Sequence, residues 1–369
     1  MALVSTGFGR VQRGFESFTE SLFNALRPLG SDLDVTLFQG GGKSGEHRVV
    51  VPNLHRADFP ARLFSDLTAS HVEKRSFAAA LYPILRAKHV DVVHYNELTM
   101  GSALFHLRHL FGGTYKLLYC NGAPSPPVHY HHRCDFAQIL TEPDLAEATS
   151  FGIQQCRLFS LPYGIDADLF HPDQKQKRER IRQELGIPLG ANLILSVAAI
   201  KAEHKRVDHL IREVSALSSN EWLVVAGQRT GETAQLEGMA EALIPGRWRF
   251  LSWPHARVAE LYGAADCFAL CSLTEAFGLV TVEAMLSELP LVVHDGPVFR
   301  WLAKGTSTQL IDMSEPEALT LALQQSIQRR ATSEHSNALK LARQTASSRF
   351  SWQALVPKYL EMYRASIAN

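Results

Sequence analysis

Two glutamates near position 280 combine residue types and a spacing that could do chemistry. Glu275 and Glu283 enclose seven residues that include Phe277, Gly278 and Leu279. Apolar runs of strand length lie on both sides, at residues 267–271 and 291–294, and the apolar residues between them recur at helical spacing. The stretch therefore predicts a strand, a tight loop, a helix and a second strand.

This geometry favours the binding of an anion and of hydroxyl groups. The first amides of a helix lack intrahelical partners and carry partial positive charge, so they bind groups such as phosphate. Gly278 would let a ligand approach the backbone closely. A carboxylate beside a diphosphate would be repelled, so Glu275 and Glu283 are expected to accept hydrogen bonds from sugar and ribose hydroxyls.

The stretch from Glu275 to Glu283 resembles the signature of the retaining GT-B glycosyltransferases of the group 1 family. The resemblance implies an α/β fold of two doubly wound, Rossmann-like parallel-sheet domains that face each other across a cleft. It also implies a UDP- or GDP-sugar donor, no required metal ion, and retention of anomeric configuration. A solvated helix in an ordinary α/β unit would explain Glu283 but would leave Glu275 and Gly278 without a reason.

The composition is that of an ordinary globular enzyme with no preference for polyanions. The chain has 369 residues, 46% apolar and 20% charged, which predicts about two domains with their own cores. Lys and Arg together number 37, as do Asp and Glu, so no net field favours nucleic acid. No secretory signal or spanning apolar run is present, and a cytoplasmic enzyme is expected.

A glycine-rich loop follows the first expected strand, at residues 2–5. It contains Gly7, Gly9, Arg10 and Gly14 and precedes a helix with an apolar stripe. Its spacing is not that of a dinucleotide-binding fingerprint, and a plain tight turn explains it equally well. It does resemble the N-terminal loop of the same family, which implies that these residues line the cleft.

Two further strands end in polar residues that could reach a ligand. The expected strand at residues 91–95 contains His94 near its end, and the one at residues 116–120 is followed by Asn121. Open α/β sheets bind ligands at the carboxyl ends of their strands, so both residues are site candidates, His94 as a catalytic one. Family members often carry a histidine at the position of Asn121, and an asparagine cannot titrate, so any acid-base role there is lost or moved.

The second half alternates strands and helices from residue 193 onward, which predicts a second parallel sheet. Family members commonly place an arginine and a lysine six residues apart after its first strand to neutralise the donor diphosphate. Here Lys205 is the expected phosphate ligand, while Ala199 stands at the arginine position. Lys201, Arg206 or Arg10 could replace the missing cation. A solvated turn of charges is the alternative.

The predicted domains are residues 1–164 on the acceptor side, residues 165–348 on the nucleotide-sugar side, and a terminal helix at 349–369 that returns to the first domain. The boundary rests on the sequence Leu-Pro-Tyr-Gly-Ile-Asp at 161–166, which marks a turn and resembles the family's hinge.

The cysteines and histidines do not predict a metal site. The five cysteines form no CxxC motif, and Cys267 and Cys271 are expected to be buried thiols on one face of a strand. His129, His131, His132 and Cys134 match no standard zinc spacing.

The sequence thus predicts a retaining, metal-independent glycosyltransferase in which Lys205 and the amides of Phe277 to Leu279 hold the diphosphate. A nucleotide-sugar epimerase of the same fold and a catalytically weak sugar-nucleotide-binding partner of another enzyme remain as alternatives. The acceptor, whether carbohydrate, lipid or natural product, is not specified. Basic residues between 60 and 89 leave a peripheral membrane contact open.

Overall fold

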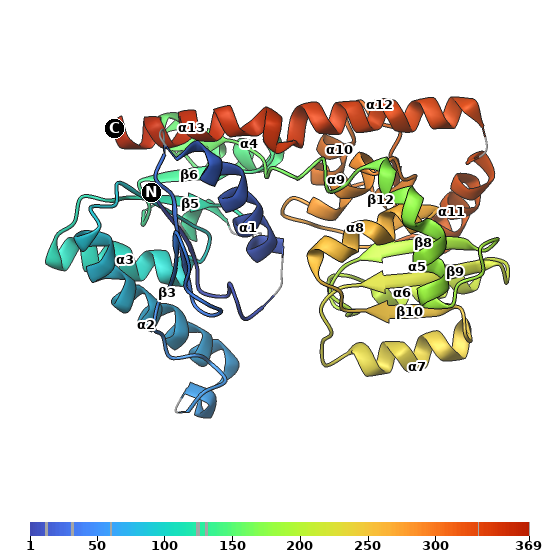
Figure 1. The fold of residues 1–369 in the computed structure, drawn as a ribbon, viewed down its shortest axis with the longest axis horizontal. Coiled ribbons are helices and arrows are strands. Elements are labelled where there is room, and N and C mark those ends of the chain that lie inside the picture. Colours follow the sequence, from blue (N-terminus) through green and yellow to red (C-terminus); the bar gives the residue numbers. More distant parts are fainter. Residues whose placement is uncertain are drawn as a thin grey trace. The chain divides into compact units, whose positions relative to one another are not determined.

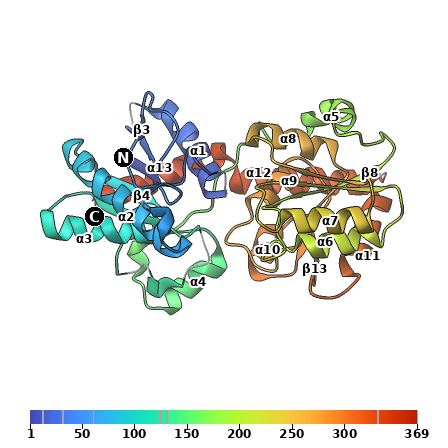
Figure 2. The same cartoon turned by 90° about the horizontal axis from the view of Figure 1, so that it is seen from below.

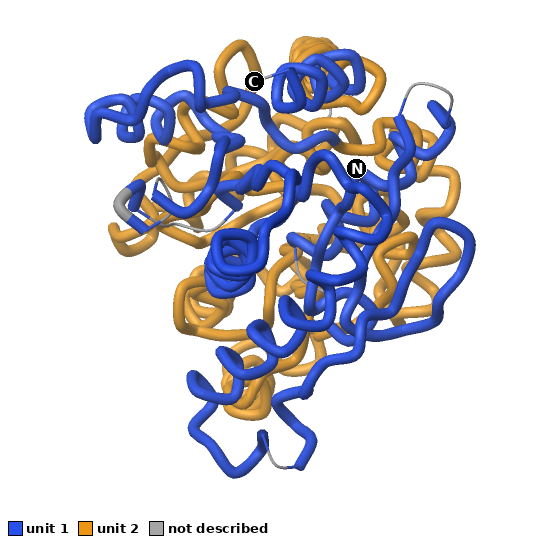
Figure 3. Tube along the Cα trace, turned by 90° about the vertical axis from the view of Figure 1, so that its left-hand side faces the viewer, with its two compact units in different colours: residues 1–164, 355–369 blue, residues 165–354 orange. Residues whose placement is uncertain are grey.

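The computed structural model describes residues 1–11, 14–30, 33–59, 61–122, 126–129, 132–330 and 332–368. The chain divides into two compact units, which Figure 3 shows in different colours. Unit 1 comprises residues 1–164 and 355–369, and unit 2 comprises residues 165–354.

Unit 1 is built on a seven-stranded parallel sheet with the order β3-β2-β1-β4-β5-β6-β7. Its strands are β1 (Ala2–Ser5), β2 (Thr36–Gln39), β3 (Arg48–Val50), β4 (Val92–Tyr95), β5 (Lys116–Cys120), β6 (Phe136–Ile139) and β7 (Leu158–Ser160). The order reverses between β1 and β4, so the crevice at which doubly wound sheets bind ligands lies beyond the carboxyl ends of these two strands.

Helices cover both faces of this sheet (Figure 1). They are α1 (Gly14–Leu26), α2 (Asp66–Ala87), α3 (Leu98–Phe111), α4 (Glu142–Ser150) and α13 (Trp352–Ala368), with short 3-10 turns at η1 (Arg27–Leu29), η2 (Ala61–Leu63), η3 (Pro127–His129) and η4 (Gln155–Arg157). Alternate residues of β1 and β4, such as Val4 and Val93, pack against α2 and α3 in one core. His94, the next residue of β4 after Val93, lies on the other face of the sheet and contacts Phe18 of α1 and Tyr363 of α13.

Unit 2 has a six-stranded parallel sheet with the order β10-β9-β8-β11-β12-β13. Its strands are β8 (Asn192–Val197), β9 (Glu221–Ala226), β10 (Trp248–Leu251), β11 (Cys267–Leu270), β12 (Leu291–His294) and β13 (Gln309–Ile311). The order reverses between β8 and β11. Two doubly wound parallel sheets confirm the predicted fold class.

The helices of unit 2 also lie on both faces of its sheet. They are η5 (Pro172–Lys177), α5 (Arg178–Leu185), α6 (Val207–Ser215), α7 (Thr233–Leu243), α8 (His255–Ala264), α9 (Leu279–Leu286), α10 (Pro297–Ala303), α11 (Ala318–Arg329) and α12 (Ser333–Phe350). Figure 2 shows α5 and α8 on one face and α6 and α7 on the other. In the described part of the chain no helix is both long enough and apolar enough to cross a bilayer.

Some elements differ from the sequence-based expectations. The edge strand β3 was not predicted, because three half-buried residues carry too little periodicity. Helix α2, for which no start was given above, begins at Asp66, where Ser65 accepts a hydrogen bond from the amide of Thr68. The C-terminal region forms two helices: α12 ends at Phe350, and only residues from Leu355 onward group with unit 1.

Candidate active site

Lys205 and Glu275 meet at the point where the strand order of unit 2 reverses. They follow β8 and β11, which are parallel neighbours, so both loops leave the same edge of the sheet. The Lys205 ammonium donates a hydrogen bond to Glu275 Oε1 across 70 residues of sequence. The two side chains keep 20% and 13% of their surface exposed, so a ligand can reach the pair.

Gly278 begins the helix that would hold an anion. Its φ of +83° lies in the left-handed region, and it is the N-cap residue of α9. A residue with a side chain would be strained in this conformation, so the loop favours a glycine here. Phe277 is buried and packs edge-on against Trp301 and Phe350, with ring centroids at 6.1 and 5.8 Å. These ring contacts of Phe277 anchor the loop that carries Phe277, Gly278 and Leu279 to the core of unit 2.

Glu283 is oriented by two residues of α8. Its Oε2 accepts a hydrogen bond from the Tyr262 hydroxyl at 2.7 Å, and its Oε1 lies 3.4 Å from His255 Nε2. Burial, and then the charge of Glu283, raise the pKa of Tyr262 well above its usual value, so this hydroxyl stays a donor. The sequence reading missed both partners. His255 and Tyr262 are seven residues apart and therefore lie on one face of the helix, and this spacing is the sequence signal that could have identified them.

The cations near Ala199 differ in how firmly they are held. Arg206 has a left-handed φ of +50°, and its guanidinium donates to the carbonyl of Met313 at 2.6 Å, which ties it to the backbone. Lys201 only lies 3.8 Å from the exposed carboxylate of Glu203. Because Lys201 has the weaker contact of the two, it could move to bind a phosphate at a lower cost in free energy than Arg206.

In unit 1 the glycine-rich loop has a packing function. Gly9 has a φ of +82°, and a Cβ there would stand 2.4 Å from the carbonyl oxygen of Gly41. The amide of Gly41 donates to the carbonyl of Phe8 at 3.0 Å, so the loop after β1 packs directly on the loop after β2. These contacts explain why position 9 requires a glycine. The amide of Arg10 donates to the carbonyl of Gly7, which closes the turn.

Arg10 belongs to a cluster of charges beyond the carboxyl ends of β1 and β4 in unit 1. Its guanidinium lies 3.3 Å from the buried carboxylate of Glu73, which also accepts a hydrogen bond from Arg56 at 2.7 Å. Glu97 follows β4 and accepts hydrogen bonds from the amide and hydroxyl of Thr6. Burial raises the pKa of Glu97. Arg10 is therefore already paired within unit 1.

His94 lies inside unit 1 with 3% of its surface exposed. Its Nδ1 is 2.9 Å from the Tyr363 hydroxyl of α13, and its ring packs against Phe18. Burial lowers its pKa to about 3, so the ring stays neutral. In this arrangement His94 contacts α13, and a catalytic role for it stays a prediction.

Asn121 directly follows β5 and is also buried. Its amide donates to the carbonyl of Gln138 at 2.9 Å, while its side-chain oxygen has no hydrogen-bond partner among the described residues. His131 lies outside the described residues. Within the described part of the chain, no group of three or more His, Cys, Asp or Glu side chains could hold a metal ion.

The cysteines behave as predicted. Cys267 and Cys271 are buried free thiols, and burial raises the pKa of each to about 12.

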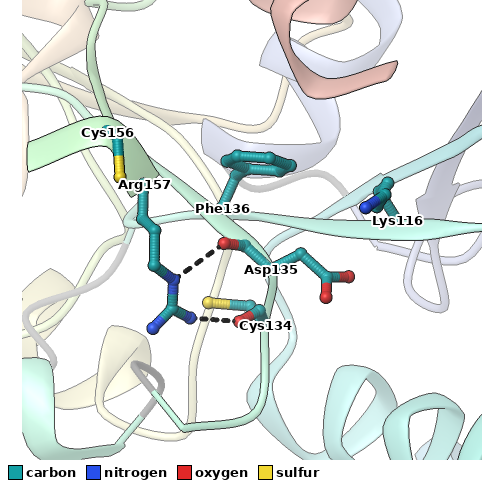
Figure 4. Close-up of a pocket in the computed structure, with 6 residues that line it drawn as sticks. All are labelled: Lys116, Cys134, Asp135, Phe136, Cys156 and Arg157. Atoms are coloured by element: carbon teal, nitrogen blue, oxygen red, sulfur yellow. Dashed lines mark hydrogen bonds between the residues drawn. The ribbon is translucent and has the colours of Figure 1, made fainter. Parts of the chain in front are cut away.

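A separate cavity of about 290 Å³ lies in unit 1, away from these residues (Figure 4). It is lined by Lys116, Cys134, Asp135, Phe136, Cys156 and Arg157. Lys116 begins β5, and Asp135 and Arg157 precede β6 and β7, so the cavity sits at the amino ends of the strands. Arg157 donates to the carbonyl of Asp135 at 2.9 Å and to that of Cys134. Because Asn121 lies at the opposite ends of these strands, this cavity is not the candidate active site.

Known proteins of similar sequence are glycosyltransferases. A D-inositol 3-phosphate glycosyltransferase of Corynebacterium glutamicum is 25% identical over 96% of this chain and 92% of its own length. One of Corynebacterium kroppenstedtii is 32% identical over 55% of this chain and 47% of its own length.

Solved structures share the fold of the whole chain. Sucrose-phosphate synthase from Thermosynechococcus elongatus superposes with a TM-score of 0.82 at 18% identity and covers 100% of this chain and 98% of its own. Anabaena HepE in complex with UDP and glucose gives 0.75 at 16% identity, with 98% of each chain covered. These likenesses establish the GT-B fold.

The family model described as "Glycosyl transferases group 1" matches residues 177–344, which contain Lys205, Glu275 and Glu283. Over these residues the chain is similar to the group 1 glycosyltransferases.

Proposed function

We propose that the protein transfers a sugar from a nucleoside-diphosphate sugar to an acceptor hydroxyl, with retention of anomeric configuration and without a metal ion. The observation that carries this proposal is the pairing of Lys205 with Glu275 beside the open first turn of α9. The relatives' names support the transferase class, and the UDP and glucose bound to HepE support a uridine donor.

Lys205 and Glu275 would exchange partners when the donor binds. The diphosphate would take Lys205 and the amides of Phe277 to Leu279, and Glu275 would then accept hydrogen bonds from the sugar hydroxyls. Glu283, held by Tyr262 and His255, would accept from the ribose. We assign the second cation to Lys201, because Arg206 is already bound to a backbone carbonyl.

The chemical step breaks the bond between the anomeric carbon and the leaving phosphate oxygen. Lys205 and the helix amides would stabilise the charge that develops on this phosphate, which is the main electrostatic contribution of the protein. The acceptor oxygen bonds to the anomeric carbon on the same face, and its proton goes to the leaving phosphate. No separate protein base is then needed.

The proposal is tested with a panel of nucleoside diphosphates and their sugars, measured by thermal shift and calorimetry with and without EDTA. We expect selective stabilisation by one nucleotide, unchanged by EDTA. Binding that EDTA abolishes would contradict the metal-independent mechanism. Donor binding without transfer to any carbohydrate or lipid acceptor would favour the partner-subunit alternative, which Ala199 motivates.

Replacing Glu275 by Gln tests its role directly. The variant keeps the shape of the side chain but loses the charge that accepts strongly from hydroxyl groups. We expect transfer to fall by about a hundredfold, as for the loss of one group that stabilises the transition state. Transfer at the native rate would remove Glu275 from the mechanism.

A further inference from the structure

Lys205 and Glu275 hold each other in the absence of a ligand, and neither has a second ion pair among the described residues. The Lys205 ammonium donates to Glu275 Oε1, and the two side chains keep 20% and 13% of their surface exposed. Each charge is therefore largely withdrawn from water and depends on the other for its compensation. A phosphate that binds Lys205 either displaces Glu275 or comes to lie beside its negative charge, and both disfavour binding.

The backbone around Lys205 favours an exchange in which only its side chain moves. His204 and Arg206, the residues on either side, have left-handed φ angles of +65° and +50°. This conformation is sparsely populated for residues with a side chain and persists only where the surroundings hold it. Arg206 is held, because its amide donates to the carbonyl of Ala202 at 2.9 Å and its guanidinium donates to that of Met313 at 2.6 Å. A change of partner is therefore a rotation of the Lys205 side chain at a fixed site.

We propose that Glu275 competes with the diphosphate for Lys205 and thereby shifts the preference of unit 2 from the bare nucleoside diphosphate towards the sugar-bearing nucleotide. This inference rests on the proposed function, in which Lys205 binds the diphosphate and Glu275 binds the sugar. When a nucleotide sugar binds, its hydroxyl groups replace the ammonium at the carboxylate. When a bare nucleoside diphosphate binds, the carboxylate loses its ammonium partner and gains none, which disfavours this complex.

The same competition acts after transfer. The sugar leaves with the acceptor, so the nucleoside diphosphate that stays behind no longer supplies hydroxyl groups to Glu275. The ion pair re-forms as this product dissociates, and its formation offsets part of the binding between phosphate and Lys205. Glu275 is thus a specificity-determining residue that favours loading of the donor and release of the product.

Calorimetric titration of the full chain tests the proposal with two matched pairs of probes, UDP with UDP-glucose and GDP with GDP-mannose. Replacing Glu275 by Gln keeps the size of the side chain but removes the charge that competes for Lys205. We expect the variant to bind the bare diphosphate about three- to tenfold more tightly than the native chain does, and the sugar nucleotide more weakly. The reason is that a neutral hydrogen bond is roughly half as strong as a charge-assisted one. A general disturbance of the site would weaken the binding of both probes.

Further variants separate competition from direct repulsion. Removing the charge of Glu275 also relieves its repulsion of the diphosphate, so Lys205→Ala is made alone and together with Glu275→Gln. We expect Glu275→Gln to tighten the binding of the bare diphosphate only where Lys205 is present. Glu241→Gln is the control, because it removes an exposed carboxylate that accepts from the Trp248 indole at 2.8 Å, at the amino end of β10. It should bind both probes as the native chain does.

The outcomes distinguish this inference from the proposed function. A native chain that binds no probe of either pair would overturn both. If the native chain binds but Glu275→Gln does not tighten the binding of the bare diphosphate, or tightens that of both probes equally, only the competition is overturned. A tightening that persists in the Lys205→Ala background would also overturn it, because repulsion would then explain the effect.

Discussion

The Lys205–Glu275 pair shows how single residues can hold a site ready for its ligand. An ammonium and a carboxylate that are mostly buried stabilise each other, yet each can exchange its partner for a substrate group of the same charge. In the proposed mechanism the pair opens when a diphosphate replaces Glu275. In the absence of a ligand it keeps both side chains in place.

Replacing Lys205 by Ala should weaken donor binding. Loss of a charged hydrogen bond costs about 1.5 to 3 kcal/mol, so the donor dissociation constant should rise by roughly ten- to a hundredfold. Calorimetric titration with the nucleotide selected by the panel measures this change. Lys340→Ala, on the exposed side of α12, is the control and should bind normally. A dissociation constant equal to that of the native protein would refute a phosphate role for Lys205.

The sequence singled out these residues but not all of their partners. Glu275, Gly278 and Glu283 were chosen because their spacing places a cap and two carboxylates around one helix start, and their roles stay predictions. The contact of Lys205 with Glu275 depends on the neighbouring positions of β8 and β11, which no local pattern encodes. For the same reason, the burial of His94 under α13 was not predicted: Tyr363 is 269 residues away.

At the scale of elements, the strand order determines which loops can act together. Both sheets reverse their order beside the first strand of the unit, so the loops after β8 and β11 converge in unit 2. Strand and helix alternation was sufficient to predict these parallel sheets. The strand β3 was not predicted, because three residues are too few to show a periodic pattern. The break between α12 and α13 was not predicted either, because the bridge between Ile165 and Ser351 that accompanies it leaves no periodic signal in the sequence.

The first turn of α9 can be tested by replacing Gly278 with Ala. The left-handed φ should cost about 1 to 2 kcal/mol of stability, and relief of this strain should shift the amides that we assign to the diphosphate. Gly305→Ala is a matched control, since its φ of +78° carries the same strain outside this loop. Chemical denaturation and nucleotide titration should show similar destabilisation in both variants, but weaker binding only for Gly278→Ala. Equal affinities would contradict the assignment.

At the scale of the whole molecule, the buried His94 should make stability depend on pH. The unfolded chain binds a proton at His94 near pH 6.5, whereas burial lowers the pKa of the folded state to about 3. Unfolding therefore takes up a proton between these values. The contribution is fully present above pH 6.5 and is lost as the pH falls, by about 1.4 kcal/mol per pH unit.

Urea denaturation at a series of pH values checks this expectation. His94→Gln should flatten the decline in the free energy of unfolding between pH 6.5 and 4, whereas His106→Gln, which alters an exposed histidine on α3, should leave it unchanged. A native profile that stays flat over this range would show that His94 is accessible to protons in the folded state.

The division of the chain into two units predicts where a nucleotide acts. Each unit has its own core, and the residues that we assign to the donor lie in unit 2. At a nucleotide concentration a hundred times its dissociation constant, binding stabilises the native state by about 2.7 kcal/mol. Hydrogen exchange should therefore slow at residues 199–206 and in α9, while the amides of the unit 1 sheet keep their native rates. Protection confined to the glycine-rich loop of unit 1 would instead place the nucleotide there, and Lys205, Glu275 and Glu283 would lose their proposed roles together.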